Sequence, residues 1–212
     1  MNDLNWFGVD QSSTLGYVYV VEDDAGMRDS IKRILIGQKY RVLSFSDPTK
    51  FLDLVTDKVS PSMLLLDMRL PHVTGLHVQS VLKERGINMP IVFMSGESTV
   101  LQAVKAIEAG AAQFLVKPVS REALIEAVKQ GLQRDVDERK KREALQIVEK
   151  RLSRLTARER EVLAFVKKGL ANADIAENLG ISVATVKQHK SSIMIKCDTK
   201  TFAELLEFLE QQ

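Results

Sequence analysis

The sequence predicts an α/β domain built on a doubly wound, five-stranded parallel sheet, followed by an all-α domain of four helices. Between Tyr17 and about Arg134, five short apolar runs alternate with longer segments whose apolar residues recur at helical spacing. Beyond Leu155 the strand-like runs disappear and only helical spacing remains. These observations divide the chain into an N-terminal extension, an α/β domain, a linker and a helical domain, at residues 1–16, 17–134, 135–154 and 155–212.

Each strand of the predicted sheet is a short apolar run. The runs are YVYVV, YRVLSF, MLLLD, IVFMS and AQFLV, at residues 17–21, 40–45, 63–67, 91–95 and 112–116. The helix-period segments that follow them are GMRDSIKRIL, TKFLDLV, LHVQSVLKE, STVLQAVKAIEA and REALIEAVKQGL. Strands that alternate with helices pair in parallel through right-handed crossovers, so the helices cover both faces of the sheet. Binding groups gather at the carboxyl ends of the strands in such a sheet.

A charged segment without Gly or Pro follows the fifth pair, and we interpret it as a helical linker that extends the fifth helix. Leu145, Val148, Leu152 and Leu155 recur at spacings of 3, 4 and 3 residues, which is typical of a short coiled-coil seam. We interpret the charged stretch 135–143 as a solvent-exposed face rather than a binding site.

The C-terminal region carries the start and stop signals of helices. Thr156 and Glu159 form a T-x-x-E capping box that opens the first helix. Gly180 ends the second helix and Ser182 caps the third, so two short helices are joined by a tight turn. This is the outline of a helix-turn-helix. A fourth helix is expected from about Thr201.

Composition limits the class of protein. With 45% hydrophobic and 27% charged residues, the chain is typical of a globular protein with an apolar core. Its single cysteine excludes an internal disulfide, and it contains no apolar run of signal-peptide or membrane-spanning length, so we expect a cytoplasmic protein without a membrane partner. Residues 155–212 carry 8 basic and 8 acidic residues, so a contact with DNA would be narrow and oriented.

Acidic, hydroxyl and basic residues mark the ends of the predicted strands. Glu22 and Asp23 follow the first strand, Asp67 ends the third, Ser95 ends the fourth and Lys117 follows the fifth. Converging carboxylates repel one another unless a cation lies between them, and a few oxygen ligands with open positions suit Mg²⁺. One carboxylate can then attack a phosphoryl group as a nucleophile. A hydroxyl and an ammonium are the groups needed to hold the added phosphoryl oxygens.

The fragments VVEDDAGMR, MLLLDMRLPHVTG, IVFMSG and FLVKP, in this order, resemble the receiver domain of two-component response regulators. The resemblance covers about residues 17–134 and implies a flavodoxin-like, CheY-like fold. It implies that Asp67 is the phospho-acceptor. It also implies that Mg²⁺ is bound by Asp23, by the Asp67 carboxylate and by the backbone carbonyl of Arg69, and that Glu22 acts on the metal through water.

The same resemblance assigns roles at the ends of the fourth and fifth strands. Ser95 and Phe114 would be the switch pair, and Lys117 would be the phosphate-binding lysine, followed by a cis bond to the next proline. Arg69 and Glu97 stand at positions that tune dephosphorylation in this family. Their opposite charges suggest a pair that shields the phosphoryl group from water.

The segment LTAREREVLAFVKKGLANADIAENLGISVATVKQHKSSIMIK resembles a LuxR-type helix-turn-helix, which together with the receiver is similar to the FixJ/NarL group of response regulators. On its third helix Val186, Ile193 and Cys197 share one face and are expected to pack inward. The residues expected to read bases are Lys187, Gln188 and Ser191. The residues expected to contact phosphates are Thr185, Lys190 and Lys196, and His189 also matches a DNA-contact position of the family.

These features predict a response regulator that a partner histidine kinase phosphorylates on Asp67. Phosphorylation is expected to promote a homodimer through residues 98–130 and to control binding to operator DNA, with RNA polymerase as a further partner. We expect no enzymatic activity beyond gain and loss of the protein's own phosphoryl group.

Two alternatives remain open. The first is a phosphatase or phosphotransferase that uses Asp67, but the first strand ends in Glu-Asp-Asp without the Asp-x-Asp spacing of haloacid-dehalogenase-type enzymes, and no sequence is left for a cap domain. The second is a regulator that works without phosphorylation through a degenerate receiver. The complete set of site residues argues against it.

Overall fold

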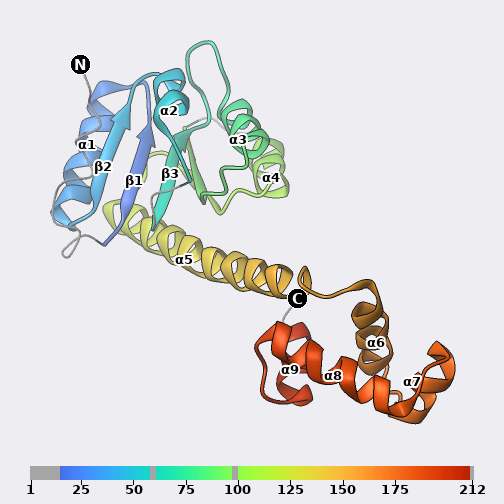
Figure 1. The fold of residues 1–212 in the computed structure, drawn as a ribbon. Coiled ribbons are helices and arrows are strands. Elements are labelled where there is room, and N and C mark those ends of the chain that lie inside the picture. Colours follow the sequence, from blue (N-terminus) through green and yellow to red (C-terminus); the bar gives the residue numbers. More distant parts are fainter. Residues whose placement is uncertain (1–14, 58–60, 97–99, 211–212) are drawn as a thin grey trace. The chain divides into compact units, whose positions relative to one another are not determined.

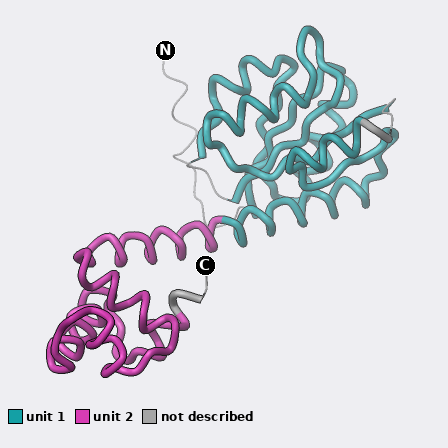
Figure 2. Tube along the Cα trace, turned by 90° about the vertical axis from the view of Figure 1, so that its right-hand side faces the viewer, with its two compact units in different colours: residues 1–138 teal, residues 139–212 magenta. Residues whose placement is uncertain are grey.

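The computed structural model describes residues 15–57, 61–96 and 100–210. Contacts divide the chain into two compact units, residues 1–138 and 139–212, which Figure 2 shows in different colours. Most of the predicted N-terminal extension lies outside the described residues, and so does Glu97 with its predicted pairing to Arg69.

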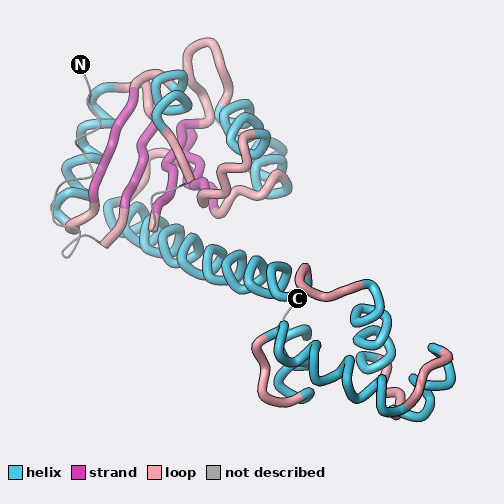
Figure 3. Tube along the Cα trace, viewed as in Figure 1, coloured by secondary structure: helices cyan, strands magenta, loops and turns pink. Residues whose placement is uncertain are grey.

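The first unit contains the predicted five-stranded parallel sheet, with strand order β2-β1-β3-β4-β5 (Figure 1). The strands are β1 (Tyr17–Val21), β2 (Arg41–Phe45), β3 (Ser62–Asp67), β4 (Ile91–Ser95) and β5 (Gln113–Val116). The helices that follow them are α1 (Ala25–Gly37), α2 (Pro48–Leu54), α3 (Gly75–Glu84), α4 (Val100–Glu108) and α5 (Arg121–Leu152). Figure 3 shows the alternation of strand and helix along this unit. The predicted fold class is confirmed.

Two apolar cores lie on opposite faces of the sheet, because successive strand residues point to opposite sides. Leu64, Leu66 and Phe93 belong to the core that includes residues of α2, α3 and α4. Met63 and Leu65 belong to the core that includes residues of α1 and α5. All residues of β3 are buried, as expected for a central parallel strand covered on both faces.

Asp135 corrects our interpretation of residues 135–143 as an exposed face. Its side chain is fully buried, and its carboxylate accepts a hydrogen bond of 2.9 Å from the backbone N–H of Ser62. Ser62 is the first residue of β3, so this bond ties α5 to the start of the central strand. Within the same stretch other charged residues are exposed, as the interpretation requires, namely Asp137, Lys140, Lys141 and Glu143.

The second unit is entirely helical in the part of the chain that the structure describes. It contains the end of α5 and the helices α6 (Ala157–Lys167), α7 (Asn172–Leu179), α8 (Val183–Cys197) and α9 (Phe202–Glu210). These helices enclose the third apolar core of the protein, which includes Val148 and Leu155, and Leu152 packs against this core. The predicted coiled-coil seam is therefore wrong for most of its length, because these side chains are occupied within the unit. Leu145 alone of the four is exposed.

Capping interactions set the boundaries of α6, α7 and α8. The predicted capping box is present, since Thr156 accepts from the N–H of Glu159 and the Glu159 carboxylate accepts from the N–H of Thr156. Gly180 ends α7 with a φ of 62°, a left-handed conformation that glycine adopts without steric cost. Ser182 caps α8 by accepting from the N–H of Thr185. None of the helices among the described residues combines the length and apolar character needed to cross a membrane.

Candidate functional sites

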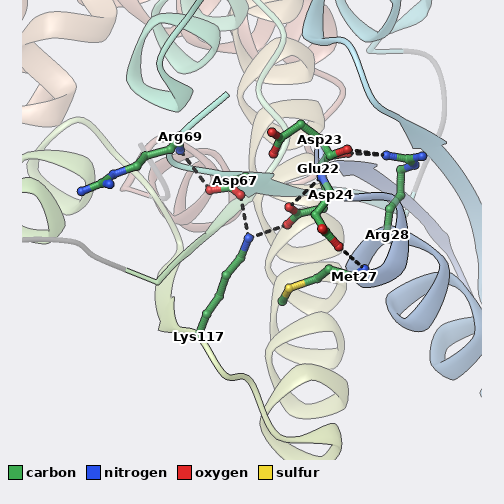
Figure 4. Close-up of polar contacts among 8 residues, drawn as sticks. All are labelled: Glu22, Asp23, Asp24, Met27, Arg28, Asp67, Arg69 and Lys117. Atoms are coloured by element: carbon green, nitrogen blue, oxygen red, sulfur yellow. Dashed lines mark hydrogen bonds and ion pairs between the residues drawn. The ribbon is translucent and has the colours of Figure 1, made fainter. Parts of the chain in front are cut away.

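An acidic cluster lies at the carboxyl end of the sheet (Figure 4). Glu22 and Asp23 follow β1 directly and Asp67 is the last residue of β3, and one carboxylate oxygen from each lies within 4.8 Å of the others. Glu22 and Asp67 are 1% and 6% exposed, whereas Asp23 is exposed. Two buried carboxylates at such a distance need a cation nearby to remain charged.

Lys117 supplies a positive charge to this cluster. Its Nζ donates to Asp67 Oδ2 at 2.6 Å and to Glu22 Oε2 at 2.7 Å. Burial alone would lower the pKa of Lys117, but the hydrogen bonds and charges of Asp67 and Glu22 outweigh burial and raise it. Burial raises the pKa of Glu22, and the negative charge of Asp67 adds to that rise, while Lys117 opposes it. The backbone N–H of Lys117 donates to the carbonyl of Ser95, which joins the ends of β4 and β5.

Hydrogen bonds made by two residues without a predicted role, Arg28 and Asp24, stabilise the backbone around the acidic cluster. Arg28, on α1, donates to the carbonyl oxygens of Glu22 and Asp23 at 2.9 and 3.0 Å. Asp24 caps α1 by accepting from the N–H of Met27 (Figure 4). The only sequence signal for Arg28 was its position in the fragment VVEDDAGMR. Its contact with the strand end depends on the three-dimensional path of the loop.

The loop after Asp67 packs closely against the phospho-acceptor candidate. The N–H of Arg69 donates to Asp67 Oδ1 at 2.9 Å, which fixes one carboxylate oxygen. A Cβ at Gly75 would lie 2.7 Å from the carbonyl oxygen of Asp67 and 2.8 Å from the ring of Phe93. Glycine is therefore required at position 75, because any side chain would push α3 away from the end of β3.

Ser95 is the last residue of β4, and Phe114 lies on the neighbouring strand β5. Ser95 is 1% exposed, and its Oγ has no hydrogen-bond partner among the described residues. Phe114 is half-buried and packs beside Phe93, with 6.5 Å between ring centroids. A buried hydroxyl without a partner is costly unless another group binds it. The predicted cis peptide bond between Lys117 and Pro118 is present.

The donor set at this site fits Mg²⁺. The clustered carboxylates of Glu22, Asp23 and Asp67 offer hard oxygen ligands, and Asp23 is accessible from solvent. The Lys117 ammonium contacts the Asp67 carboxylate, and the buried Ser95 hydroxyl at the end of β4 has no partner among the described residues. An ammonium and a hydroxyl are the groups that can hold phosphoryl oxygens.

A second candidate site is the face of α8 that points away from its core. Val186, Ile193 and Cys197 are fully buried, as predicted. The three residues predicted to read bases are all exposed, namely Lys187, Gln188 and Ser191. Buried and exposed residues therefore alternate around α8 at helical spacing, so its outer face is available to a ligand.

The residues predicted to contact phosphates have partners within the second unit. The hydroxyls of Thr185 and Ser182 are 2.8 Å apart, and His189 is half-buried. Lys190 donates to Asn172 Oδ1 at 3.0 Å, and its Nζ lies 4.5 Å from the ring centroid of Phe202.

Lys196, the third residue predicted to contact phosphates, forms an ion pair with Glu159 of the same unit. Its Nζ donates to both carboxylate oxygens of Glu159, at 2.7 and 2.8 Å, so this half-buried lysine is bound to a buried acid. Ser192 also donates to Glu159, at 2.6 Å. Burial of Glu159 works to raise its pKa, but the hydrogen bonds from Lys196, Ser192 and Thr156 dominate and lower the pKa to about 2. Sequence spacing showed the capping role of Glu159 but not this pairing.

Family comparisons match both units. The sequence model of the response regulator receiver domain matches residues 18–129. The model of bacterial regulatory proteins of the luxR family matches residues 153–209.

Similar proteins match along nearly the whole chain. The response regulator protein TmoT of Ectopseudomonas mendocina is 37% identical over 196 residues, which cover 92% of this chain and 88% of that protein. The transcriptional regulatory protein FixJ of Azorhizobium caulinodans is 34% identical over 189 residues, covering 89% of each. The solved structure of the response regulator StyR is 35% identical with a TM-score of 0.79, covering 92% of this chain and 98% of StyR. Full-length FixJ from B. japonicum is 30% identical with a TM-score of 0.59, covering 93% and 97%.

Proposed function

Because the chain belongs to the two-component response regulators, with a receiver domain and a LuxR-type DNA-binding domain, we propose that phosphorylation of Asp67 by a partner histidine kinase controls its binding to operator DNA. The observation that carries the proposal is the surroundings of Asp67. The buried Asp67 carboxylate pairs with the Lys117 ammonium and clusters with the carboxylates of Glu22 and Asp23. The strand β4 ends in the buried hydroxyl of Ser95, which has no partner among the described residues.

The proposed reaction is a phosphoryl transfer to the Asp67 carboxylate. A bond forms between a carboxylate oxygen and phosphorus, the bond between phosphorus and the donor histidine nitrogen breaks, and the imidazole leaves with its electron pair. Mg²⁺ held by Asp23, Asp67 and the carbonyl of Arg69, with Glu22 acting through water, would neutralise negative charge at the acceptor.

The remaining residues respond to the new charge. Lys117 now pairs with Asp67 Oδ2, and it can transfer this contact to an oxygen of the added phosphoryl group. The Ser95 hydroxyl can donate to a second phosphoryl oxygen. Movement of Ser95 would release Phe114, on the adjacent strand, to change its rotamer. This sequence of contacts is how we propose that phosphorylation changes the surface near β5.

We propose a phosphorylation-promoted homodimer through residues 98–130. Exposed apolar side chains on this part of the first unit support the proposal. Val104 and Ile107 on α4 are 44% and 48% exposed, and Val116 at the end of β5 is 70% exposed. Apolar side chains in such positions favour association once their surroundings are rearranged.

We further propose that the outer face of α8 enters the major groove of operator DNA. Lys187 would donate to guanine, Gln188 would pair with adenine, and Ser191 would contact a neighbouring base edge. The protein would act in the cytoplasm, where the DNA is, and would influence RNA polymerase at the promoter. We propose no reaction on a separate substrate, because the site residues are accounted for by transfer to Asp67.

Phosphorylation with a small donor tests the site directly. In Mg²⁺ and acetyl phosphate the wild type should gain one phosphoryl group and Asp67→Asn none, as measured by intact-protein mass spectrometry. Asp24→Asn is the matched control, because Asp24 is exposed and caps α1, a role that asparagine also fulfils. Labelling of Asp67→Asn to the wild-type level would mean that another residue is the acceptor.

A further inference from the structure

We propose that Val183 and Ala184, the first two residues of α8, form an apolar surface that recognises the C5-methyl group of thymine. This inference rests on the proposed function, since it requires α8 to enter the major groove. It adds a specificity determinant that none of the polar contacts supplies, because thymine is the base that carries a methyl group in that groove.

The two side chains are exposed at the start of the helix. Val183 is 41% exposed and Ala184 is exposed. Ile181, two residues earlier, packs against the third core, whereas Val183 does not belong to that core in the described part of the chain. The exposed part of the apolar surface of Val183 and Ala184 therefore does not contribute to the core of the second unit.

The hydroxyl groups of this turn are occupied by the helix cap. Ser182 accepts from the N–H of Thr185 at 3.1 Å, and the hydroxyls of these two residues lie 2.8 Å apart. The first turn of α8 contains no acidic residue that would accept from cytosine or repel phosphate. The methyl groups of Val183 and Ala184 therefore form an exposed apolar part of this turn.

Helical spacing places these methyl groups beside the proposed base-reading residues. Ala184, Gln188 and Ser191 are related by steps of four and three residues, so they follow one line on the exposed face. Val183 and Lys187 are related by four residues and follow the adjacent line. Residues near the N-terminus of a recognition helix are those that reach base edges in helix-turn-helix proteins. The methyl surface should therefore contact a thymine next to a base pair read by Lys187 or Gln188.

The test compares thymine with uracil, which pairs identically but lacks the methyl group. Full-length protein treated with acetyl phosphate is first used to select a binding site from random duplex DNA. The selected site is then synthesised with deoxyuridine in place of each thymine in turn. Wild type should bind at least one substituted site about fourfold more weakly, the effect of leaving one methyl group unburied.

Two variants test whether the weaker binding to uracil-substituted DNA depends on the proposed side chains. At least one of Val183→Ala and Ala184→Gly should bind thymine and uracil sites within twofold of each other at that position, with unchanged affinity for scrambled DNA. Ile195→Ala is the matched control, because Ile195 is a 76% exposed apolar residue at the other end of α8 and should leave the penalty unchanged. A full penalty in both Val183→Ala and Ala184→Gly, or its loss in Ile195→Ala, overturns the proposal.

The selection step separates failure of this inference from failure of the proposed function. Recovery of no preferred sequence would contradict sequence-specific DNA binding itself. Recovery of a preferred site whose affinity is insensitive to uracil at every position would leave DNA binding intact and overturn the methyl contact alone.

Discussion

Two lysines are held by buried carboxylates, one in each compact unit. Lys117 pairs with Glu22 and Asp67, and Lys196 pairs with Glu159. Lys117 could exchange its present carboxylate partners for new ones, because a phosphoryl group on Asp67 would offer its ammonium further oxygens. Among the described residues Lys196 has no comparable alternative partner for its ammonium, and breaking its pair with Glu159 would leave the buried Glu159 carboxylate without a neutralising cation. We infer that Lys117 serves signalling, whereas Lys196 holds α8 against α6.

Glu159 predicts a pH dependence of stability. Its pKa is lowered to about 2 in the folded protein from 4.5, so the folded carboxylate contributes stability above pH 4.5 that is lost as the pH falls toward 2. At pH 6, Glu159→Gln should lower the free energy of unfolding by about 1–3 kcal/mol. Denaturant unfolding of wild type and variant at several pH values checks this, and the difference between them should shrink progressively below pH 4.5. A difference that is constant down to pH 2.5 would contradict the assignment.

At the scale of elements, the sequence predicts what depends on local spacing and misses what depends on distant partners. The strands, the α6 capping box and the buried stripe of α8 follow from periodicity and cap residues close in sequence. The residues at strand ends were predictable because parallel topology brings those ends together. The burial of Asp135 and the pairing of Lys196 with Glu159 were not predicted, because the partners of these residues are 73 and 37 residues away and local spacing does not reveal such contacts.

The packing of the end of α5 into the core of the second unit was not predicted for the same reason, and this packing can be tested by mutation. Val148 is 3% exposed and belongs to the core of the second unit, so Val148→Ala should destabilise that unit by about 1–3 kcal/mol. The adjacent Ile147 is 49% exposed, and Ile147→Ala should cost less than about 0.5 kcal/mol. Hydrogen exchange of α6 and α8 in the full chain distinguishes the two. Equal protection in both variants would indicate that Val148 is not a core residue in solution.

At the scale of the whole molecule, the proposed phospho-acceptor Asp67 and the proposed DNA-reading helix α8 belong to different compact units. Phosphorylation at Asp67 can therefore affect DNA binding only through an equilibrium in which both units take part. Dimerisation through residues 98–130 would supply this equilibrium, since two linked DNA-binding units on adjacent half-sites bind more tightly than one. Coupling free energies of this type correspond to about 5–150-fold changes in affinity.

The most direct test of this account is footprinting on genomic DNA with and without acetyl phosphate, using wild type and Asp67→Asn in parallel, with light scattering on the same samples. Phosphorylated wild type should become dimeric and protect defined sites at a concentration about 5–150-fold lower than the untreated protein. Asp67→Asn should behave as untreated wild type in both conditions. Identical footprints at identical concentrations for confirmed phosphorylated and unphosphorylated wild type would contradict the claim that Asp67 controls DNA binding.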